Sequence, residues 1–408
     1  MASNPLPGHL SPVFAVGEEL VRRGHKVALC TTPLEGTDIA KTVAERAGMD
    51  YIDAGKAYLT YAEYQAVFAA AGTGNSTLSD RWKVFNLHPD TSIRMGKFLD
   101  RQNLTNYDII VATERLAPVM ACLGKRWNVP GIILGTTHQF QAQHLPEWPF
   151  PPFYAKKQGS LRISDDMTFV ERLRALVFTS FGISFARLFT SHYEFVCPDS
   201  AVGYSYMNNY LGTRAPHIIP TAIGFEYPRT ISPLTHYVGP LLSKRPQAMP
   251  TELQRWLDSK ADNSVILVSM GSVAHLTHEQ ARVIVETIWS TNYSAVWSLR
   301  DRNRYILEGL DVDNGRFYFS KWMPQVAVLN HSATGMAILH GGMNGVHEAV
   351  AYGVPVIAIP FWSDQGDVVA RLHHSGAGIQ ILRSHLTVKT LSTAILDIRD
   401  GELRMLAC

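Results

Sequence analysis

Cysteine is scarce in this 408-residue sequence, and the few cysteines present form no motif. They lack the Cys-X-X-Cys spacing of zinc and redox sites. A chain of this length can bury enough apolar surface to fold without disulfide bonds. We therefore expect reduced thiols and a cytoplasmic location. The cysteines are Cys30, Cys122, Cys197 and Cys408.

Long apolar runs and blocks of like charge are also absent. No apolar run is long enough to span a membrane, and the first residues, MASNPLPGHLSP, lack the basic and apolar regions of a secretory signal. The 37 basic and 35 acidic residues give a net charge of +2 and are spread along the chain. These features predict no transmembrane segment and no nucleic-acid partner, and they favour a local binding pocket.

The hydrophobic share of 46% and the charged share of 18% are ordinary for a globular enzyme. Short runs rich in β-branched residues alternate with helical patterns, which is typical of parallel sheets buried on both faces. The first helix is predicted over Pro12 to Arg23, with Ser11 as its cap. The predicted strands are residues 27–30, 107–112 and 131–134, followed by SVILVSMGS, RFYFSKW, ATGMAILH, VPVIAIP and GIQIL in a second series that begins at Ser264.

The chain is long enough for two α/β domains of comparable size. The segment between the two series is polar and contains prolines, which favours an interdomain linker over residues 241–250. We therefore predict an N-terminal domain over residues 1–240 and a C-terminal domain over residues 251–408. Aromatic residues gather between Phe140 and Tyr154, where they could line an apolar pocket or simply pack within a loop.

A glycine-rich turn between a strand and a helix is the first candidate binding site. In AILHGGMNGVHEAVAYGVPVIAIP, His340 ends the strand, Gly341 and Gly342 form the turn, and the helix is expected from about Val346. The free N–H groups and positive end of such a helix suit a pyrophosphate. Taken alone the pattern is weak, because many structural turns are rich in glycine.

The spacing of the residues around this turn makes it specific. Trp322 opens the motif WMPQ eighteen residues before His340, Glu348 follows eight residues after His340, and Asp364-Gln365 closes the set after the next strand. Together they resemble the 44-residue donor-binding signature of the UDP-dependent glycosyltransferases, the family that includes plant secondary-product enzymes and animal UDP-glucuronosyltransferases. Every spacing of that signature is kept without a gap.

The resemblance implies how the nucleoside is bound. Trp322 would stack on the uracil, Gln325 would contact the nucleoside, and Glu348 would bind the ribose hydroxyls. The ordinary alternatives are a core or hinge tryptophan at Trp322 and a solvated helix face at Glu348.

The phosphates and the sugar have their own implied contacts. His340, Gly342 and Asn344 would face the pyrophosphate and the sugar, and Ser272, in the loop after SVILVSM, would reach a phosphate. Gly345 stands where the family often has serine, so one hydroxyl contact to phosphate is expected to be absent. These groups would neutralise the charge that grows on the departing pyrophosphate.

Asp364 and Gln365 would hold the sugar, and a glutamine at position 365 is similar to the glucose-using members of the family. Both residues could also cap the helix that follows them. A metal site through His340, His347 and Glu348 is a remote alternative, because their spacing matches no zinc pattern. We expect no metal and no cofactor besides the UDP-sugar substrate.

The N-terminal domain would supply the base. The loop PGHLSP resembles the family loop whose histidine deprotonates the acceptor hydroxyl, which makes His9 the candidate. The family's supporting aspartate, counted back from Asn128-Val129-Pro130, falls on Glu114, which keeps the charge and adds a methylene group. The ordinary alternatives are an exposed histidine near a terminus and a surface carboxylate after a strand.

The fold that the resemblance implies is GT-B, with two Rossmann-like, doubly wound parallel-sheet domains that face a cleft. The family's first strand precedes the Gly8-His9 loop, where this chain has only eight residues. We therefore expect that strand to be missing, with unpaired backbone groups beside the base. The family's terminal helix is also expected to be shortened at Cys408.

The predicted activity is inverting transfer of a hexose, glucose first, from a UDP-sugar to a hydroxyl group of a small lipophilic acceptor, with His9 as base. Two alternatives stay open. One is a nucleotide-sugar-binding remnant without turnover, and the other is a UDP-sugar epimerase, which the full donor signature disfavours.

Overall fold

The computed structural model describes residues 1–34, 39–57, 59–73, 77, 91–136, 168–170, 173, 215–226, 231–244, 248–271, 274–312, 315–361 and 364–401. The chain divides into two compact units, and the main division falls between Lys244 and Arg245. The aromatic segment from Phe140 to Tyr154 lies outside the described residues, as do Ser272, Cys197 and Cys408. Cys30 is a free, buried thiol.

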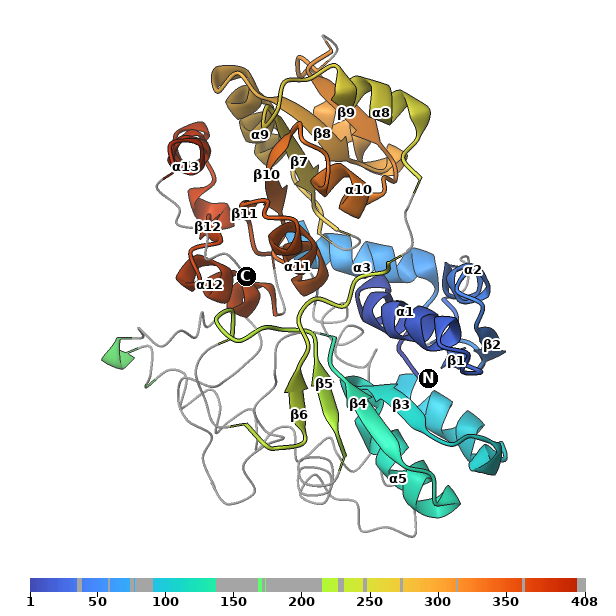
Figure 1. Ribbon diagram of the computed structural model, residues 1–408. Coiled ribbons are helices and arrows are strands. Elements are labelled where there is room, and N and C mark those ends of the chain that lie inside the picture. Colours follow the sequence, from blue (N-terminus) through green and yellow to red (C-terminus); the bar gives the residue numbers. More distant parts are fainter. Residues whose placement is uncertain are drawn as a thin grey trace. The chain divides into compact units, whose positions relative to one another are not determined.

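The second unit is built on one sheet of six parallel strands (Figure 1). Its order is β12-β11-β10-β7-β8-β9, with the two central strands, β10 and β7, side by side. The strands are β7 Val265–Ser269, β8 Ser294–Ser298, β9 Phe317–Ser320, β10 Thr334–Leu339, β11 Val356–Ala358 and β12 Gly378–Gln380. Every residue of β7 is buried, as expected for a strand covered on both faces.

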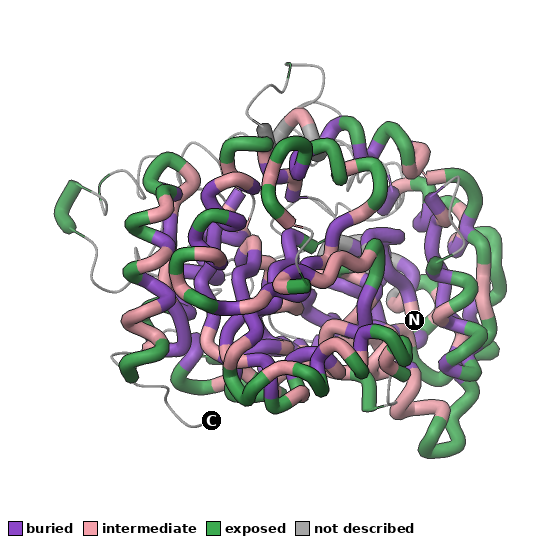
Figure 2. The backbone as a smooth tube through the Cα atoms, turned by 90° about the horizontal axis from the view of Figure 1, so that it is seen from above, coloured by how far each residue is buried: buried purple, intermediate pink, exposed green. Residues whose placement is uncertain are grey.

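Helices cover both faces of this sheet. α9 and α13 share a core cluster with Val268, Trp297 and Ile338 on one face, whereas α10, α11 and α12 pack in a row, with α11 resting on β10 and β11. The helices are α8 Thr251–Asp258, α9 His278–Ser290, α10 Gln325–Leu329, α11 Met343–Ala351, α12 Gln365–His374 and α13 Val388–Arg399, with 3-10 turns at Asp301–Leu307 and Arg383–His385. Figure 2 shows the backbone coloured by burial, with β7 among its purple, buried stretches.

The first unit also has parallel strands, in two sheets of order β1-β2 and β3-β4-β5-β6. The strands are β1 Ala28–Thr31, β2 Asp50–Asp53, β3 Ile110–Thr113, β4 Gly131–Leu134, β5 His217–Ile219 and β6 Thr235–Tyr237. The helices are α1 Pro7–Arg22, α2 Ile39–Arg46 and α5 Ala117–Trp127; residues 91–100 are helical, and 3-10 turns span Leu104–Asn106 and Glu114–Leu116. Helix α3 Tyr61–Thr73 begins in this unit, and its residues from Phe68 onward belong to the second unit.

The two faces of the first unit are covered by different helices. Val111 and Leu134 pack with α1 and α2, whereas Ala112 and Ile133 pack with α5 and the helix at residues 91–100. Successive strand residues point to opposite faces, so this division places a core on each side of the sheet.

Helix α1 begins earlier than the sequence pattern predicts. It starts at Pro7, so Ser11 is not its cap and Pro12 lies inside the helix. The reason is burial: Leu10 and Val13 are both only 1% exposed, and one more amino-terminal turn brings Leu10 into the core. Pro7 suits the new first position, where its missing N–H has no helical partner to lose.

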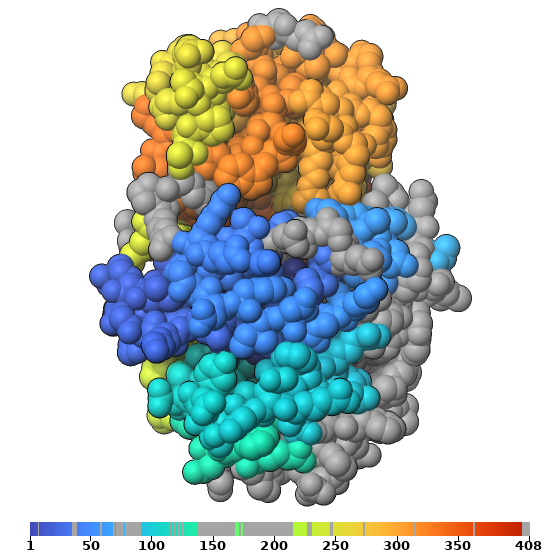
Figure 3. Space-filling model, turned by 90° about the vertical axis from the view of Figure 1, so that its right-hand side faces the viewer, coloured from blue at the N-terminus to red at the C-terminus, as the bar shows by residue number. Residues whose placement is uncertain are grey.

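Residues 1–3 partly close the gap that the sequence predicts between β1 and β3. Ala2 forms parallel bridges to both Cys30 and Ala112. Its N–H donates to the Val111 carbonyl at 2.7 Å, and the Ser3 N–H donates to the Cys30 carbonyl at 3.2 Å. Figure 3 shows the blue surface of the amino-terminal part of the chain directly beside the cyan surface of the residues from 91 onward. This short segment therefore joins the two sheets.

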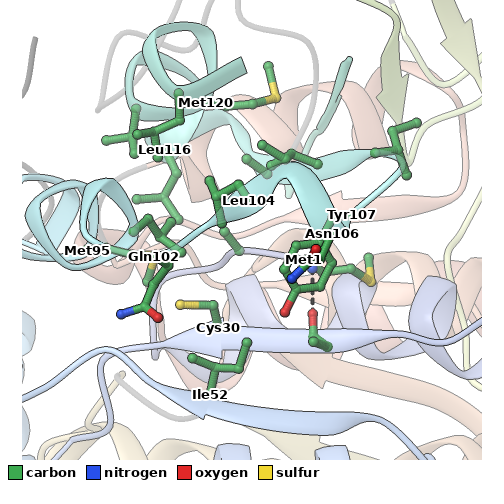
Figure 4. Close-up of a pocket in the computed structure, with 18 of the residues that line it drawn as sticks. Met1, Cys30, Ile52, Met95, Gln102, Leu104, Asn106, Tyr107, Leu116 and Met120 are labelled. Carbon is green, nitrogen blue, oxygen red and sulfur yellow. Dashed lines mark hydrogen bonds between the residues drawn. The ribbon is translucent and has the colours of Figure 1, made fainter. Parts of the chain in front are cut away.

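A cavity of about 180 Å³ remains beside this junction (Figure 4). Cys30 and Ile52 approach it from the first sheet, and Met95, Leu116 and Met120 approach it from the helices. The Met1 amino group donates to the Ala28 carbonyl at 2.5 Å, and burial lowers its pKa to about 6. Burial raises the pKa of the Cys30 thiol to about 12, so the thiol is neutral at neutral pH.

Substitution of Cys30→Leu should fill part of this cavity in the 408-residue chain. We expect the free energy of unfolding to rise by about 1 kcal/mol, measured by urea denaturation, because the added methyl groups enter unoccupied apolar space. The matched control is Ala337→Val in β10, a fully buried position, where overpacking should cost about 1–3 kcal/mol. An equal decrease in the free energy of unfolding of the two variants would contradict the presence of a cavity beside Cys30 that a larger side chain can fill.

Candidate functional site

The turn between β10 and α11 is shaped by its glycines. A Cβ at Gly342 would lie 2.4 Å from His340 Nε2, and a Cβ at Gly271, after β7, would lie 2.4 Å from His340 Cε1. A Cβ at Gly341, whose φ is +81°, would lie 2.3 Å from Val369 Cγ2. Only glycine fits at these positions. The glycines therefore hold the His340 ring between two strand ends and let α12 approach the turn.

Helix α11 points its amino end at this turn. It begins at Met343, three residues before the predicted start, because the Val346 N–H bonds to the Gly342 carbonyl and closes the first turn. Its cap residue, Gly342, provides no side-chain cap. By contrast, capping boxes close α9 at Thr277 and α13 at Thr387. The amino end of α11 therefore combines backbone N–H groups that lack a side-chain cap from Gly342 with the positive end of the helix dipole.

The His340 side chain is a neutral group at neutral pH. Burial lowers its pKa to about 4, and the nearby Asp364 and the Ser269 backbone offset this only in part. A neutral imidazole donates a hydrogen bond to an anion but adds no full positive charge. His340 therefore offers a hydrogen-bond donor without a full charge, and the positive end of the α11 dipole adds to it.

Gln325 and Glu348 form a hydrogen-bonded pair on neighbouring helices. The Gln325 Nε2 amide, at the start of α10, donates to Glu348 Oε2 at 2.6 Å in the second turn of α11. Burial raises the pKa of the Glu348 carboxyl to about 7, and the bond from Gln325 opposes this rise. Glu348 is thus a half-buried acceptor rather than part of a solvated helix face.

Trp322 lies between β9 and α10 and is 63% exposed. The alternative of a core tryptophan is therefore wrong. The Ser320 hydroxyl donates to the Trp322 carbonyl, which fixes the backbone below the ring. A large exposed indole three residues before the Gln325 amide is available as a stacking surface.

Asp364 and Gln365 lie at the amino end of α12. Asp364 occupies the cap position, but its side chain makes no capping bond, so the simple capping alternative does not account for its carboxylate. The Gln365 side-chain oxygen accepts a hydrogen bond from the Phe361 N–H at 2.8 Å, which ties the β11–α12 loop to the helix. The Gln365 Cβ would lie 3.7 Å from a Cβ at Gly341, so this helix end adjoins the glycine turn.

The metal alternative gains no support from the geometry. Within the described ranges, there is no group of three or more His, Cys, Asp or Glu side chains that could hold a metal ion. This holds for His340, His347 and Glu348 as well. His347 is buried, and burial lowers its pKa to about 4.

In the first unit, His9 and Glu114 meet at a third residue, Thr136. His9 lies in the first turn of α1, Glu114 directly follows β3, and Thr136 follows β4. The Thr136 hydroxyl lies 3.1 Å from His9 Nδ1 and 2.5 Å from Glu114 Oε1. The Thr136 N–H donates to Glu114 Oε2 at 3.0 Å. The His9 and Glu114 side chains are half-buried. Neither is therefore the fully exposed group that the ordinary alternatives describe.

The sequence analysis missed Thr136, although a signal for it exists. Glu114 and Thr136 both come just after predicted strands that are neighbours in the same parallel sheet. The carboxyl ends of parallel strands meet at one edge, so polar residues at these two positions are expected to lie close together.

Comparison with known proteins bears on this arrangement. Residues 66–404 match the model of the family described as UDP-glucoronosyl and UDP-glucosyl transferase. This chain belongs to that family. The matched region contains Glu114, Thr136 and the residues from Trp322 to Gln365, and His9 lies before it.

Among curated relatives, the chain is similar to UDP-glucuronosyltransferase 2B33 of Macaca mulatta, with 26% identity over 75% of this chain and 57% of the relative. It is similar to UDP-glucuronosyltransferase 2B7 of Homo sapiens, with 28% identity over 70% of this chain and 53% of the relative. The chain thus spans little more than half the length of these two transferases.

Solved structures of glycosyltransferases share the fold. The glycotransferase of kitacinnamycin superposes with a TM-score of 0.66 and 18% identity, over 98% of this chain and 90% of that structure. Phytolacca americana UGT2, complexed with UDP-2fluoro-glucose and pterostilbene, superposes with a TM-score of 0.63 and 16% identity, over 98% and 90%. The predicted GT-B fold class is confirmed. Among the helices of the described part, none is long and apolar enough to cross a membrane.

The raised pKa of Glu348 predicts a pH-dependent stability in this family member. Folding favours the protonated carboxyl, so its stabilising contribution is complete below pH of about 4.5 and is lost as the pH rises through about 7. At pH 8 we expect the free energy of unfolding of Glu348→Gln, measured by urea denaturation, to exceed that of the wild type by about 3 kcal/mol at most. At pH 4.5 most of this difference should disappear.

The control for this measurement is Glu252→Gln, which removes an exposed carboxylate from α8 of the same unit. Its urea midpoint should follow that of the wild type at both pH values. If Glu348→Gln also followed the wild type, burial would not be acting on the Glu348 carboxyl.

Proposed function

We propose that this chain is an inverting glycosyltransferase that moves a hexose, glucose in the first instance, from a UDP-sugar to a hydroxyl group of a small lipophilic acceptor. One observation carries the proposal: residues that match the family's donor signature lie together around the glycine turn and the first two turns of α11. Gln325 contacts Glu348, Gly342 seats His340, and the start of α12 adjoins Gly341. Family membership supports the same activity.

Each group of this site has a chemical part in donor binding. The exposed Trp322 ring stacks on uracil, and the Glu348 carboxylate accepts from the ribose hydroxyls beside Gln325. The α11 N–H groups and the neutral His340 imidazole bind the pyrophosphate. Asp364 and Gln365 hold the sugar hydroxyls. This donor set uses no metal ion, because the helix end supplies the positive potential.

The transfer step is a single displacement. His9 Nε2 removes the acceptor proton while the acceptor oxygen forms a bond to the anomeric carbon. The bond from that carbon to the pyrophosphate oxygen breaks, and its electron pair leaves with UDP from the opposite face, so the configuration inverts. Oriented N–H donors stabilise the charge that develops on the leaving group.

Two substitutions should separate donor binding from transfer. Trp322→Ala should weaken UDP binding about 10-fold or more in calorimetry, because base stacking is lost. His9→Ala should leave UDP affinity unchanged and lower acceptor-dependent UDP release about 100- to 10,000-fold. Tyr352→Ala, an exposed aromatic at the opposite end of α11, is the control for Trp322→Ala. Retained turnover in His9→Ala would remove the base assignment.

The wild-type chain tests the activity itself with a panel of phenols and sterols. UDP release that depends on both acceptor and UDP-glucose is the expected result, whereas UDP binding without release would indicate a remnant. The named relatives are UDP-glucuronosyltransferases, so UDP-glucuronate and UDP-galactose belong in the panel. Faster turnover with either sugar would overturn the preference for glucose.

Gly345 offers a test of the phosphate subsite. A Cβ there would meet only ordinary contacts, the nearest at 3.5 Å from Gln325 Nε2, so a serine fits in the first turn of α11. We expect Gly345→Ser to tighten UDP binding about 5-fold, through one added hydrogen bond to phosphate. Gly345→Ala is the matched control, since it raises helix propensity without a hydroxyl group. Equal UDP affinities in the two variants would contradict a phosphate at this turn.

A further inference from the structure

The Thr136 hydroxyl lies where the His9 ring and the Glu114 carboxylate can share it. It is 2.5 Å from Glu114 Oε1 and 3.1 Å from His9 Nδ1, and Thr136 itself is 6% exposed. The Thr136 backbone N–H holds the other carboxylate oxygen at 3.0 Å. Two bonds from one residue therefore fix the carboxylate, and one of them continues to the ring of the proposed base.

Counting protons on this chain of bonds fixes the direction of each. An ionised carboxylate only accepts, so the Thr136 hydroxyl donates its single proton to Glu114 Oε1. The hydroxyl then has only lone pairs to offer to His9, and the Nδ1 atom must carry the hydrogen. In a neutral imidazole with a proton on Nδ1, Nε2 has the free lone pair that a general base needs.

We infer that Thr136 is a positioning residue that sets the tautomer of His9 and connects its ring to the Glu114 carboxylate. This inference rests on the proposed function, in which His9 accepts the acceptor proton. When Nε2 takes up that proton, the ring becomes an imidazolium whose Nδ1–H still donates to the Thr136 oxygen. The hydroxyl is polarised by the carboxylate, so it stabilises the new positive charge more than a lone hydroxyl does.

Thr136→Val tests this arrangement, because valine keeps the size and shape of threonine and removes the hydroxyl group. We expect kcat to fall about 10- to 100-fold, with the KM for the UDP-sugar and the affinity for UDP unchanged. The ascending limb of kcat/KM against pH should move to lower pH, because the imidazolium loses stabilisation. Thr136→Ser restores the hydroxyl and should recover kcat to within about 3-fold.

Thr31→Val is the matched control for the chemical change. Thr31 is a buried threonine at the end of β1, and its hydroxyl has no hydrogen-bond partner in the part of the chain that the structure describes. Its kcat and pH profile should equal those of the wild type. A thermal melt of every variant reports loss of folding separately from loss of turnover.

A purely structural role for Thr136 predicts different results. If the residue only ties Glu114 to the end of β4, Thr136→Val should lower the melting temperature and leave kcat and the pH profile of the folded enzyme unchanged. That result overturns the inference, and so does an equal loss of kcat in the valine and serine variants.

Nitrogen NMR of the His9 ring tests the inference without turnover. The wild type should carry its proton on Nδ1 when neutral, and Thr136→Val should lose this preference. If no acceptor in the panel supports UDP release while the wild-type ring keeps the Nδ1 proton through Thr136, the proposed function fails and the tautomer assignment stands. A wild-type ring with its proton on Nε2 overturns the assignment whether or not the enzyme turns over.

Discussion

Parallel pairing of the strands within each sheet is the constraint on which both groups of functional residues depend. Because parallel strands run in one direction, the loops that follow them all open at the same edge of a sheet. In the second unit that edge carries Gly271 after β7, Trp322 after β9, His340 after β10 and Asp364 after β11. In the first unit, Glu114 follows β3 and Thr136 follows β4. Residues distant in sequence are brought together at strand ends, without specific contacts being needed to assemble them.

Local pattern was sufficient to predict the elements that are buried most completely. The runs at β4, β7 and β10 consist almost wholly of apolar residues, and the structure has strands there. Strand β8 was missed because Ser294 and Ser298 end a short run. Strands β5 and β6 contain polar residues and lack the apolar runs that surround the equally short β11 and β12. Helix starts depend on which side chain gains burial, as Leu10 does in α1, and a local pattern does not contain that information.

The two groups of candidate residues also differ in how far the sequence predicts their arrangement. The residues from Trp322 to Gln365 lie within one continuous segment of strands and helices, so their spacing alone identified them. The link from His9 through Thr136 to Glu114 joins the first turn of α1 to the segments that follow β4 and β3. No spacing rule connects such residues. The neutral state of His340 and the raised pKa of Glu348 depend on burial, which a sequence motif does not report.

A very short stretch of paired backbone supports the candidate base His9. Ala2 forms bridges to both β1 and β3, and the next residue, Ser3, donates from its hydroxyl to the His9 carbonyl at 3.3 Å. The segment that joins the two sheets therefore also holds the first turn of α1. Since Glu114 and Thr136 follow the strands on one side of this junction, the position of His9 relative to them depends on the backbone bonds of Ala2. A shift of this segment would move the ring away from the Thr136 hydroxyl while the fold of both sheets stayed intact, because each sheet keeps its own ladder of hydrogen bonds.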